Sequence, residues 1–233
     1  LVAASWGRTL TANDRILVSV LEHHANLVPW QQTAAQVEPI PLTPEGDLDL
    51  NALSGLLDER VKLVCVTELS NAIGTRPPLR KISEIVHGAG ALLLVDGAQG
   101  LSHGPSNLRE FDADFYAMSA HKSYGPMGFG ALFGRAELLR AMPPYQTGGG
   151  MIRKVSFEGT TFADIPEKFE PGTPHVAGAL AWSEAIDFLR EQDWDQATQT
   201  EDALVRRLRE GLCEIPGVRL IGAPENHAAV VSF

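Results

Sequence analysis

The chain has 233 residues, of which 44% are hydrophobic and 21% charged, and 19 basic against 29 acidic side chains give a net charge of −10. A chain of this length buries roughly 70–75% of the surface that it exposes when unfolded. The composition therefore excludes a disordered tail and a disulfide-stabilised miniprotein. The acidic balance disfavours nucleic acid and anionic membranes as partners, because both require a basic surface.

Cysteine usage and the chain ends bear on cellular location. Cys65 and Cys213 are the only cysteines, without metal-binding spacing, so neither a disulfide framework nor a zinc site is indicated. No run approaches the ~20 apolar residues of a membrane span, and the first residues lack the basic region of a signal peptide. We expect a cytoplasmic protein. Because the chain starts at Leu1 and stops within an apolar segment, we also expect it to be part of a longer protein.

Short apolar segments alternate with segments of helical periodicity, which is typical of βαβ units around a mostly parallel sheet. In chain order, strands are predicted at 15–20, 37–42, 63–69, 91–96, 115–119 and 129–133. Helices are predicted between them at 26–36, 48–59 and 79–87. In the last of these, Leu79, Ile82 and Val86 recur at helical spacing. The predicted fold class is α/β, with helices flanking a mostly parallel central sheet.

The last third of the chain has a different pattern. Residues 143–174 are rich in Gly and Pro and show no clear periodicity, and loops of this length are usually functional. Helices follow at 177–190 and 196–212, and strands are expected near 218–221 and 229–233. We therefore expect a large domain over residues 1–175 and the beginning of a smaller α/β domain over residues 176–233.

Polar residues follow four of the predicted strands. In open α/β sheets, ligands bind beyond the carboxyl ends of the strands. We expect a site at that edge of the sheet, built from Glu22-His23-His24-Ala25-Asn26, Ser70-Asn71, Asp96-Gly97-Ala98-Gln99 and Ser119-Ala120-His121-Lys122.

Lys122 and Asp96 are the central candidates at this edge. Lys122 lies between an apolar strand and a tight Gly-Pro turn, and desolvation there would free its amine for Schiff-base chemistry. Asp96 ends a very apolar strand, where a carboxylate favours a cationic partner such as the pyridinium nitrogen of pyridoxal phosphate. The alternatives are a solvated surface lysine and an aspartate that caps a helix.

The neighbouring histidines and short polar side chains could complete such a site. On an extended backbone His23 and His24 point to opposite sides, so one imidazole could stack on a ligand ring. A metal site that pairs Glu22 with His24 is the alternative, although no third ligand stands at a recognisable spacing. Ser119, His121 and the glycines after Lys122 could receive a phosphate.

With these residues in place, the chain resembles class V aminotransferase-fold enzymes, and most closely group II cysteine desulfurases and selenocysteine lyases. The resemblance implies the pyridoxal phosphate-dependent transferase fold type I. It is carried, in family order, by Glu22-His23-His24-Ala25-Asn26-Leu27-Val28-Pro29-Trp30, Leu69-Ser70-Asn71-Ala72-Ile73-Gly74, Val95-Asp96-Gly97-Ala98-Gln99, Asp114-Phe115-Tyr116-Ala117-Met118-Ser119-Ala120-His121-Lys122-Ser123-Tyr124-Gly125-Pro126, Gly148-Gly149-Gly150-Met151-Ile152 and Phe169-Glu170-Pro171-Gly172-Thr173-Pro174.

The resemblance also implies a role for each site residue. Lys122 would bind pyridoxal 5'-phosphate covalently and then move protons, and His23 would stack on the ring. Asp96 would contact the pyridine nitrogen, Gln99 the ring hydroxyl, and Asn71 both the ring hydroxyl and the substrate carboxylate. Ser119 and His121 would bind the phosphate, together with Thr173 from the partner subunit of a homodimer. The substrate would be L-cysteine or L-selenocysteine, and the sulfur would pass to an enzyme cysteine and on to an acceptor protein for iron–sulfur cluster assembly.

Three departures from the family pattern stand out. His175 replaces the usual Asn of the Thr173 motif, the Thr-rich phosphate loop expected before Leu1 is absent, and the family's nucleophilic cysteine and substrate-binding arginine would lie beyond Phe233. Neither cysteine of the chain is expected to substitute, since Cys65 lies in an apolar strand and Cys213 closes a helix far from the site. This chain alone would then hold the cofactor without removing sulfur.

Other functions remain open from the sequence. An amino-acid epimerase or a kynureninase-like hydrolase would share much of the cofactor site. A non-catalytic truncated homologue would account for the missing nucleophile. A metal-dependent or Ser-His-Asp hydrolase using His24, His103 or Asp96 is a weaker alternative, because no Gly-x-Ser-x-Gly motif occurs.

Overall fold

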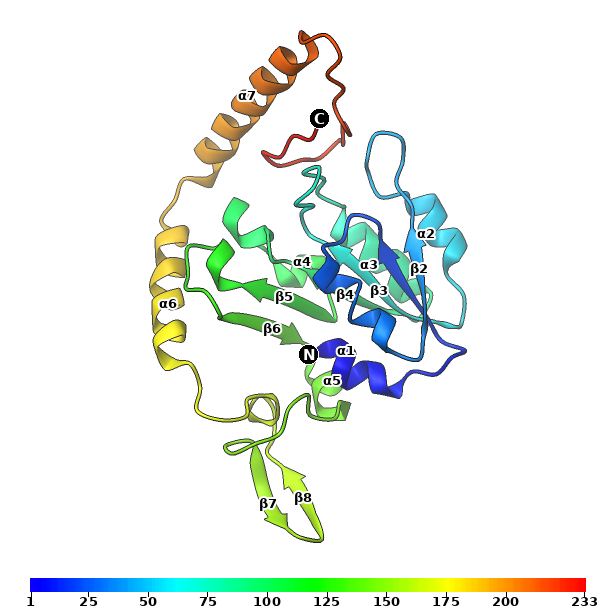
Figure 1. The fold of residues 1–233 in the computed structure, drawn as a ribbon, viewed down its shortest axis with the longest axis vertical. Coiled ribbons are helices and arrows are strands. Elements are labelled where there is room, and N and C mark those ends of the chain that lie inside the picture. Colours follow the sequence, from blue (N-terminus) through cyan, green and yellow to red (C-terminus); the bar gives the residue numbers. More distant parts are fainter.

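The computed structural model describes the whole chain from Leu1 to Phe233. A six-stranded sheet in the order β2-β1-β3-β4-β5-β6 forms its centre (Figure 1). The neighbouring strands pair in parallel up to β5, and β6 is antiparallel to β5. The strands are β1 Arg15–Ser19, β2 Gln36–Ile40, β3 Val61–Thr67, β4 Leu92–Asp96, β5 Phe115–Ser119 and β6 Gly130–Gly134.

Helices flank the sheet, and the two longest, α6 and α7, lie in the last third of the chain (Figure 1). The α-helices are α1 Val2–Ser5, α2 Leu50–Leu56, α3 Leu79–Gly88, α4 Leu108–Phe111, α5 Ala136–Ala141, α6 Val176–Arg190 and α7 Trp194–Cys213. Short 3-10 helices are η1 Trp6–Thr9, η2 His24–Asn26, η3 Trp30–Gln32, η4 Gly100–His103, η5 Ala120–Lys122 and η6 Glu167–Phe169.

The core lies on both faces of the sheet, because the side chains of the central strands alternate between two buried layers. On one face, Val64 of β3 packs in a cluster with Leu53 of α2 and Ile82 of α3. On the other face, Leu63 of β3 packs in a cluster with Trp30 of η3. The continuous apolar runs of β3 and β4 follow from this burial on two sides.

The six predicted strands of the central sheet are present, but some other expected elements are not. The predicted helix at 26–36 is wrong, since η2 and η3 occupy this stretch and β2 begins at Gln36. Polar side chains close local turns there: Asn26 accepts from the indole of Trp30 at 3.2 Å, and Thr33 donates to the Trp30 carbonyl at 2.7 Å. Such local bonds compete with a regular helix.

The predicted strands near 218–221 and 229–233 are also wrong. A single bridge joins Ile221 to Ser232, and the backbone of this tail bonds instead to distant loops. Its segment around His227 forms a bridge to Thr75, and the Ala223 N–H donates to the Glu45 carbonyl at 2.6 Å. The pairing partners of the tail therefore lie elsewhere in the chain.

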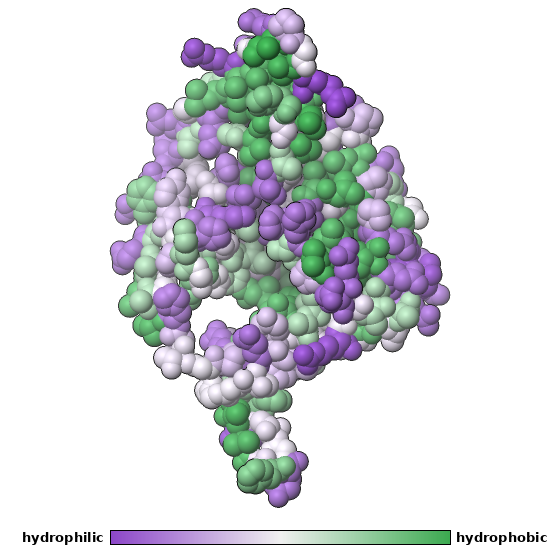
Figure 2. Space-filling view, viewed as in Figure 1, coloured by the Kyte–Doolittle hydropathy of each residue, from purple (hydrophilic) through white to green (hydrophobic).

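The Gly- and Pro-rich stretch contains an antiparallel hairpin, which the sequence pattern did not predict. Its strands are β7 Ile152–Ser156 and β8 Gly159–Phe162. The hairpin projects away from the sheet (Figure 1), and Figure 2 shows apolar surface along it. Val155 and Phe157 are exposed on it.

The expected division into residues 1–175 and 176–233 stays a prediction. Helix α6 begins at Val176 and packs on the end of the sheet, because the Trp182 indole donates to Ser123 at 2.9 Å and contacts the Phe129 ring edge-on. The helices of the structure include none with the length and apolar character needed to span a lipid bilayer.

Candidate active site

The carboxyl ends of β1, β3, β4 and β5 lie at one edge of the sheet because these strands run parallel. A cavity of about 610 Å³ opens beside this edge. Five of the predicted site residues line it, and they come from three of the four predicted segments: His23, Asp96, Ser119, His121 and Lys122. The tertiary structure thus brings together residues that are up to about a hundred positions apart in sequence.

Lys122 is the last residue of η5, the short helical turn that directly follows β5. Its side chain is half-buried and takes part in none of the ion pairs of the structure. The turn after it is rigidly closed, since the N–H groups of Ser123 and Gly125 both donate to the Ala120 carbonyl at 2.9 Å. A Cβ at Gly125 would lie 2.5 Å from Trp182, so glycine is required where α6 packs on this turn.

Asp96 ends β4 and is half-buried. Its Oδ1 accepts the N–H of Ala98 at 2.9 Å within the turn after β4. The N-cap of the following helix η4 is Gln99, so Asp96 does not have the helix-capping role that the sequence left open. No protein group donates to its Oδ2. That oxygen remains available for a cationic partner in the cavity.

His23 lines the cavity, whereas His24 is not among the lining residues. His23 precedes η2 and accepts the N–H of Ala25 on its Nδ1 at 3.2 Å. This bond fixes the orientation of the ring at the cavity wall, and the residue is exposed. The two imidazole rings are tilted by 39° with centroids 5.6 Å apart.

Ser119 and His121 form a polar pair beside the lysine. The Ser119 hydroxyl lies 2.9 Å from Nδ1 of His121, and both residues line the cavity. A hydroxyl and an imidazole placed together in this way offer hydrogen bonds to an anion such as a phosphate.

Three predicted site residues lie outside this cavity. Asn71 is exposed in the loop after β3, and Thr173 is exposed just before α6. Gln99 precedes η4 and its side chain makes no capping bond. The structure of a single chain therefore brings none of the three to the residues that line the cavity.

Glu22 is a site residue whose burial the sequence did not reveal. Its Oε1 accepts from the Ser19 hydroxyl and from the N–H of Thr67, both at 2.6 Å, and its Oε2 accepts from Nδ2 of Asn26 at 2.7 Å. The carboxylate thereby fastens the segment that carries His23 to the ends of β1 and β3. Ser19, Glu22 and Asn26 lie close together in sequence at the end of an apolar strand. This grouping was the sequence signal that could have indicated the hydrogen-bonded carboxylate.

The electrostatic environment of Glu22 is unfavourable for a negative charge. Burial raises its pKa to about 7, and the nearby Asp96 carboxylate contributes in the same direction. The three hydrogen bonds oppose this rise in pKa, because they stabilise the ionised form.

Glu22 is thus engaged with the sheet, not with His24 as a metal site would require. No cluster of three or more His, Cys, Asp or Glu side chains suited to a metal occurs in the structure.

A second buried carboxylate explains the glycines that follow Asp96. Glu68 accepts hydrogen bonds from the hydroxyl of Ser106 at 2.8 Å and from that of Tyr116, and burial raises the pKa of Glu68. A Cβ at Gly100 would lie 1.8 Å from this carboxylate, and one at Gly97 would lie 2.0 Å from Tyr116. The loop that carries Asp96 can pack this closely only with glycine at both positions.

Neither cysteine lines the cavity. Cys65 is fully buried in β3, and desolvation raises the pKa of its thiol, with Glu22 and Asp96 adding to the effect. Cys213 is exposed at the end of α7. A nucleophilic thiol requires an accessible, electropositive setting, which Cys65 lacks.

Comparison with known proteins places this cavity in a family context. The family model described as "Aminotransferase class-V" matches residues 1–233. A cysteine desulfurase of Dickeya dadantii is 46% identical over all of the chain and 58% of its own length, and a probable cysteine desulfurase of Vibrio cholerae is 45% identical over 59% of its length. The chain thus spans less than two thirds of these relatives.

Solved structures give the same result. A crystal structure of a cysteine desulfurase from Escherichia coli matches 95% of the chain and 57% of its own length, with 42% identity and a TM-score of 0.90. An apo cysteine desulfurase from Thermococcus onnurineus matches all of the chain and 59% of its own length, with 35% identity and a TM-score of 0.91. The expected pyridoxal phosphate-dependent fold type I is confirmed. The chain belongs to the class V aminotransferase family.

Proposed function

We propose that this chain provides the pyridoxal 5'-phosphate site of a cysteine desulfurase. The observation that carries the proposal is the presence of Lys122 and Asp96 on the walls of one cavity. The cavity of about 610 Å³ has the size of small-molecule sites in proteins. The free Oδ2 of Asp96 and the unpaired, half-buried amine of Lys122 are the groups that this cofactor needs.

Each lining residue has a proposed role toward the cofactor. Lys122 holds it covalently and then carries protons to and from the substrate carbon. Asp96 binds its ring nitrogen through Oδ2, His23 covers one face of the ring, and Ser119 and His121 bind its phosphate. The short distance between Ser119 and His121 supports their acting as one phosphate-binding pair.

Asn71, Gln99 and Thr173 require a different argument. We propose that Gln99 and Asn71 contact the ring hydroxyl and the substrate carboxylate once the site is filled. Thr173 is exposed and does not line the cavity, so we propose that its phosphate contact is made in the partner subunit of a homodimer.

The reaction that we propose releases alanine from L-cysteine. Bound pyridoxal phosphate withdraws electrons from the substrate carbon, which makes its proton acidic. Lys122 accepts that proton at Nζ, and the carboxylate of Asp96 keeps the cofactor's ring nitrogen protonated. A thiolate then attacks the substrate sulfur to form a persulfide, the bond between that sulfur and the substrate β-carbon breaks, and the electron pair left on this carbon takes up a proton, which gives alanine. The buried Cys65 is unsuited as that thiolate.

The wider context of the activity is also a proposal. The two relatives named above are a cysteine desulfurase and a probable cysteine desulfurase, which supports L-cysteine as the substrate and leaves selenocysteine as the competing one. Transfer of the persulfide sulfur to an acceptor protein, a role in iron–sulfur cluster assembly and a cytoplasmic location complete the proposed function.

A covalent trapping experiment tests the cofactor site. The purified chain is incubated with pyridoxal phosphate, its visible absorbance is recorded, and borohydride reduction is followed by peptide mass spectrometry. We expect a visible band and a reduced adduct on the peptide that contains Lys122. Lys122→Ala should lose both, whereas Lys154→Ala, which changes an exposed lysine of β7, should keep both. An unchanged band in Lys122→Ala would refute the assignment.

Substrate chemistry needs a separate measurement. The chain loaded with pyridoxal phosphate, without borohydride reduction, and the equally treated Lys122→Ala variant are supplied with L-cysteine, and alanine is quantified. Alanine formation that depends on an intact Lys122 would support the desulfurase reaction in this chain. If the adduct forms and alanine does not, the cofactor assignment stands and the thiolate step requires residues beyond this chain.

A further inference from the structure

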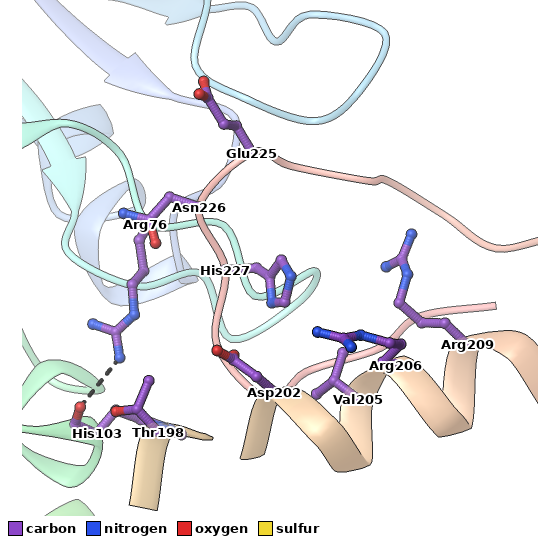
Figure 3. A pocket seen from close by; sticks show the side chains of 10 residues that line it. All are labelled: Arg76, His103, Thr198, Asp202, Val205, Arg206, Arg209, Glu225, Asn226 and His227. Atoms are coloured by element: carbon purple, nitrogen blue, oxygen red, sulfur yellow. Dashed lines mark hydrogen bonds between the residues drawn. The ribbon is translucent and has the colours of Figure 1, made fainter. Parts of the chain in front are cut away.

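A second cavity, of about 560 Å³, shares no lining residue with the cavity that Lys122 lines. It is bounded by one side of α7, by the residue that ends η4 and by the tail segment after Pro224 (Figure 3). Its lining is almost entirely polar and consists of Arg76, His103, Thr198, Asp202, Val205, Arg206, Arg209, Glu225, Asn226 and His227.

The cavity gathers three arginines in a chain that carries a net charge of −10. None of Arg76, Arg206 and Arg209 belongs to an ion pair of the structure. Arg76 donates one bond to the His103 carbonyl at 3.3 Å, and Arg209 donates one to the Gly222 carbonyl at 3.0 Å. Since each guanidinium has five N–H donors, most of these donors have no protein acceptor.

The arginines approach the cavity from opposite sides. Figure 3 shows Arg76 extending from its loop on one side and Arg206 extending from α7 on the other, with the His227 ring between them. The two carboxylates of the lining only partly offset this charge. Glu225 points away from the centre and Asp202 lies beside His227 (Figure 3). Glu201, next to the lining, is paired with His103 at 3.5 Å.

Backbone bonds hold the walls of this cavity in place. The N–H of Arg76 donates to the Asn226 carbonyl at 2.9 Å, and the N–H of Ala228 donates to the Gly74 carbonyl at the same distance. Thr75 and His227 form a β-bridge between these bonds. The loop and the tail therefore form one preformed wall opposite α7.

We propose that this cavity binds a small polyanion that carries two or more phosphate or carboxylate groups. An anion with two or more charged groups can accept hydrogen bonds from both Arg76 and Arg206, which extend into the cavity from opposite sides (Figure 3). Arginine forks match the geometry of phosphate and carboxylate oxygens, and the volume of about 560 Å³ suits a molecule of this size. The proposal is independent of the chemistry assigned to Lys122.

Calorimetric titration at fixed ionic strength tests this site, with inorganic pyrophosphate and citrate as the two probes. The chain is first saturated with pyridoxal phosphate, so that the phosphate subsite near Ser119 does not compete for the probe. We expect saturable binding of one equivalent of pyrophosphate, of citrate, or of both, and the difference between the probes tells which anionic group is preferred.

Three variants locate the bound probe. Arg206→Gln and Arg76→Gln should each weaken binding about tenfold, because each removes charge-assisted hydrogen bonds. Arg207→Gln is the matched control, since Arg207 is adjacent in α7 but does not line this cavity. Arg206 is exposed on the helix, so its variant should fold, and circular dichroism verifies this. Absence of binding by both probes, or an equal loss in Arg207→Gln, would overturn the proposal.

Discussion

Replacement of Glu22 by Gln tests whether this carboxyl group is buried beside Asp96 as the structure describes. Burial and the Asp96 charge raise the pKa of Glu22 to about 7 from its usual 4.5. Because each pKa unit between the unfolded and folded states corresponds to about 1.4 kcal/mol, protonated Glu22 favours the folded state by about 3 kcal/mol. This stabilisation is fully present below pH 4.5 and is lost as the pH rises to about 7.

The glutamine variant removes this titration without removing much volume. Its amide must place an NH₂ group toward either the N–H of Thr67 or the Nδ2 of Asn26, both of which donate to Glu22 in the parent chain. At acidic pH the neutral carboxyl group of the parent meets the same difficulty with its O–H, so the informative quantity is the pH dependence of the difference. Between pH 5 and pH 8 the stability of the parent relative to the variant should fall by about 2–3 kcal/mol.

Urea unfolding of both proteins at pH 5, 6, 7 and 8 measures this difference. Subtraction cancels the contribution of other titrating groups such as Glu68, whose pKa is also raised by burial. Glu59→Gln serves as the matched control, because Glu59 is exposed and should change stability by less than about 0.5 kcal/mol. A difference between parent and Glu22→Gln that is constant with pH would refute the inferred burial of the Glu22 charge.

Three further substitutions test the packing around the site. Gly97→Ala should destabilise the chain by about 3 kcal/mol in urea unfolding, because its Cβ would lie 2.0 Å from Tyr116. The control Gly55→Ala, which has open space at its Cβ, should be neutral or stabilising. Equal effects of the two substitutions would contradict the contact between Gly97 and Tyr116. Trp182→Phe should cost about 1 kcal/mol, because it removes the indole hydrogen bond to the turn after β5; an unchanged unfolding midpoint would argue against that bond. Ile82→Ala should lower stability by about 2–5 kcal/mol in calorimetric unfolding, since this side chain is 0% exposed, and a loss below about 1 kcal/mol would place it outside the core.

The strands of the central sheet could be predicted from sequence because their apolar runs record burial directly. The expected strand at 115–119 matches β5, and the expected helix at 79–87 differs from α3 only at its last residue. In contrast, residues 26–36 have enough apolar residues for a helix but fold as two short turns closed by Asn26 and Thr33. Hydrogen bonds of individual side chains determine that outcome, and the periodicity of apolar residues does not reveal which of these bonds form.

The candidate site was predictable only in part. The position of Lys122 after one strand and of Asp96 after another predicted a shared edge, because parallel strands end on the same side of a sheet. The buried state of Glu22 depends on Thr67, which lies 45 positions along the chain. The three arginines of the second cavity come from a loop and a helix whose proximity no local pattern indicates.

By itself, the order of apolar runs and turn residues determined an α/β chain with a lysine and an aspartate after two strands of a mostly parallel sheet. Periodicity suffices for this, because strand burial is recorded in short segments and the helices between successive strands favour parallel pairing. The tertiary structure decided which polar side chains share a cavity, which carboxylates lose their solvent, and where the tail after α7 binds. These outcomes depend on contacts between distant segments, and the energy of a charge depends on every group that surrounds it after folding.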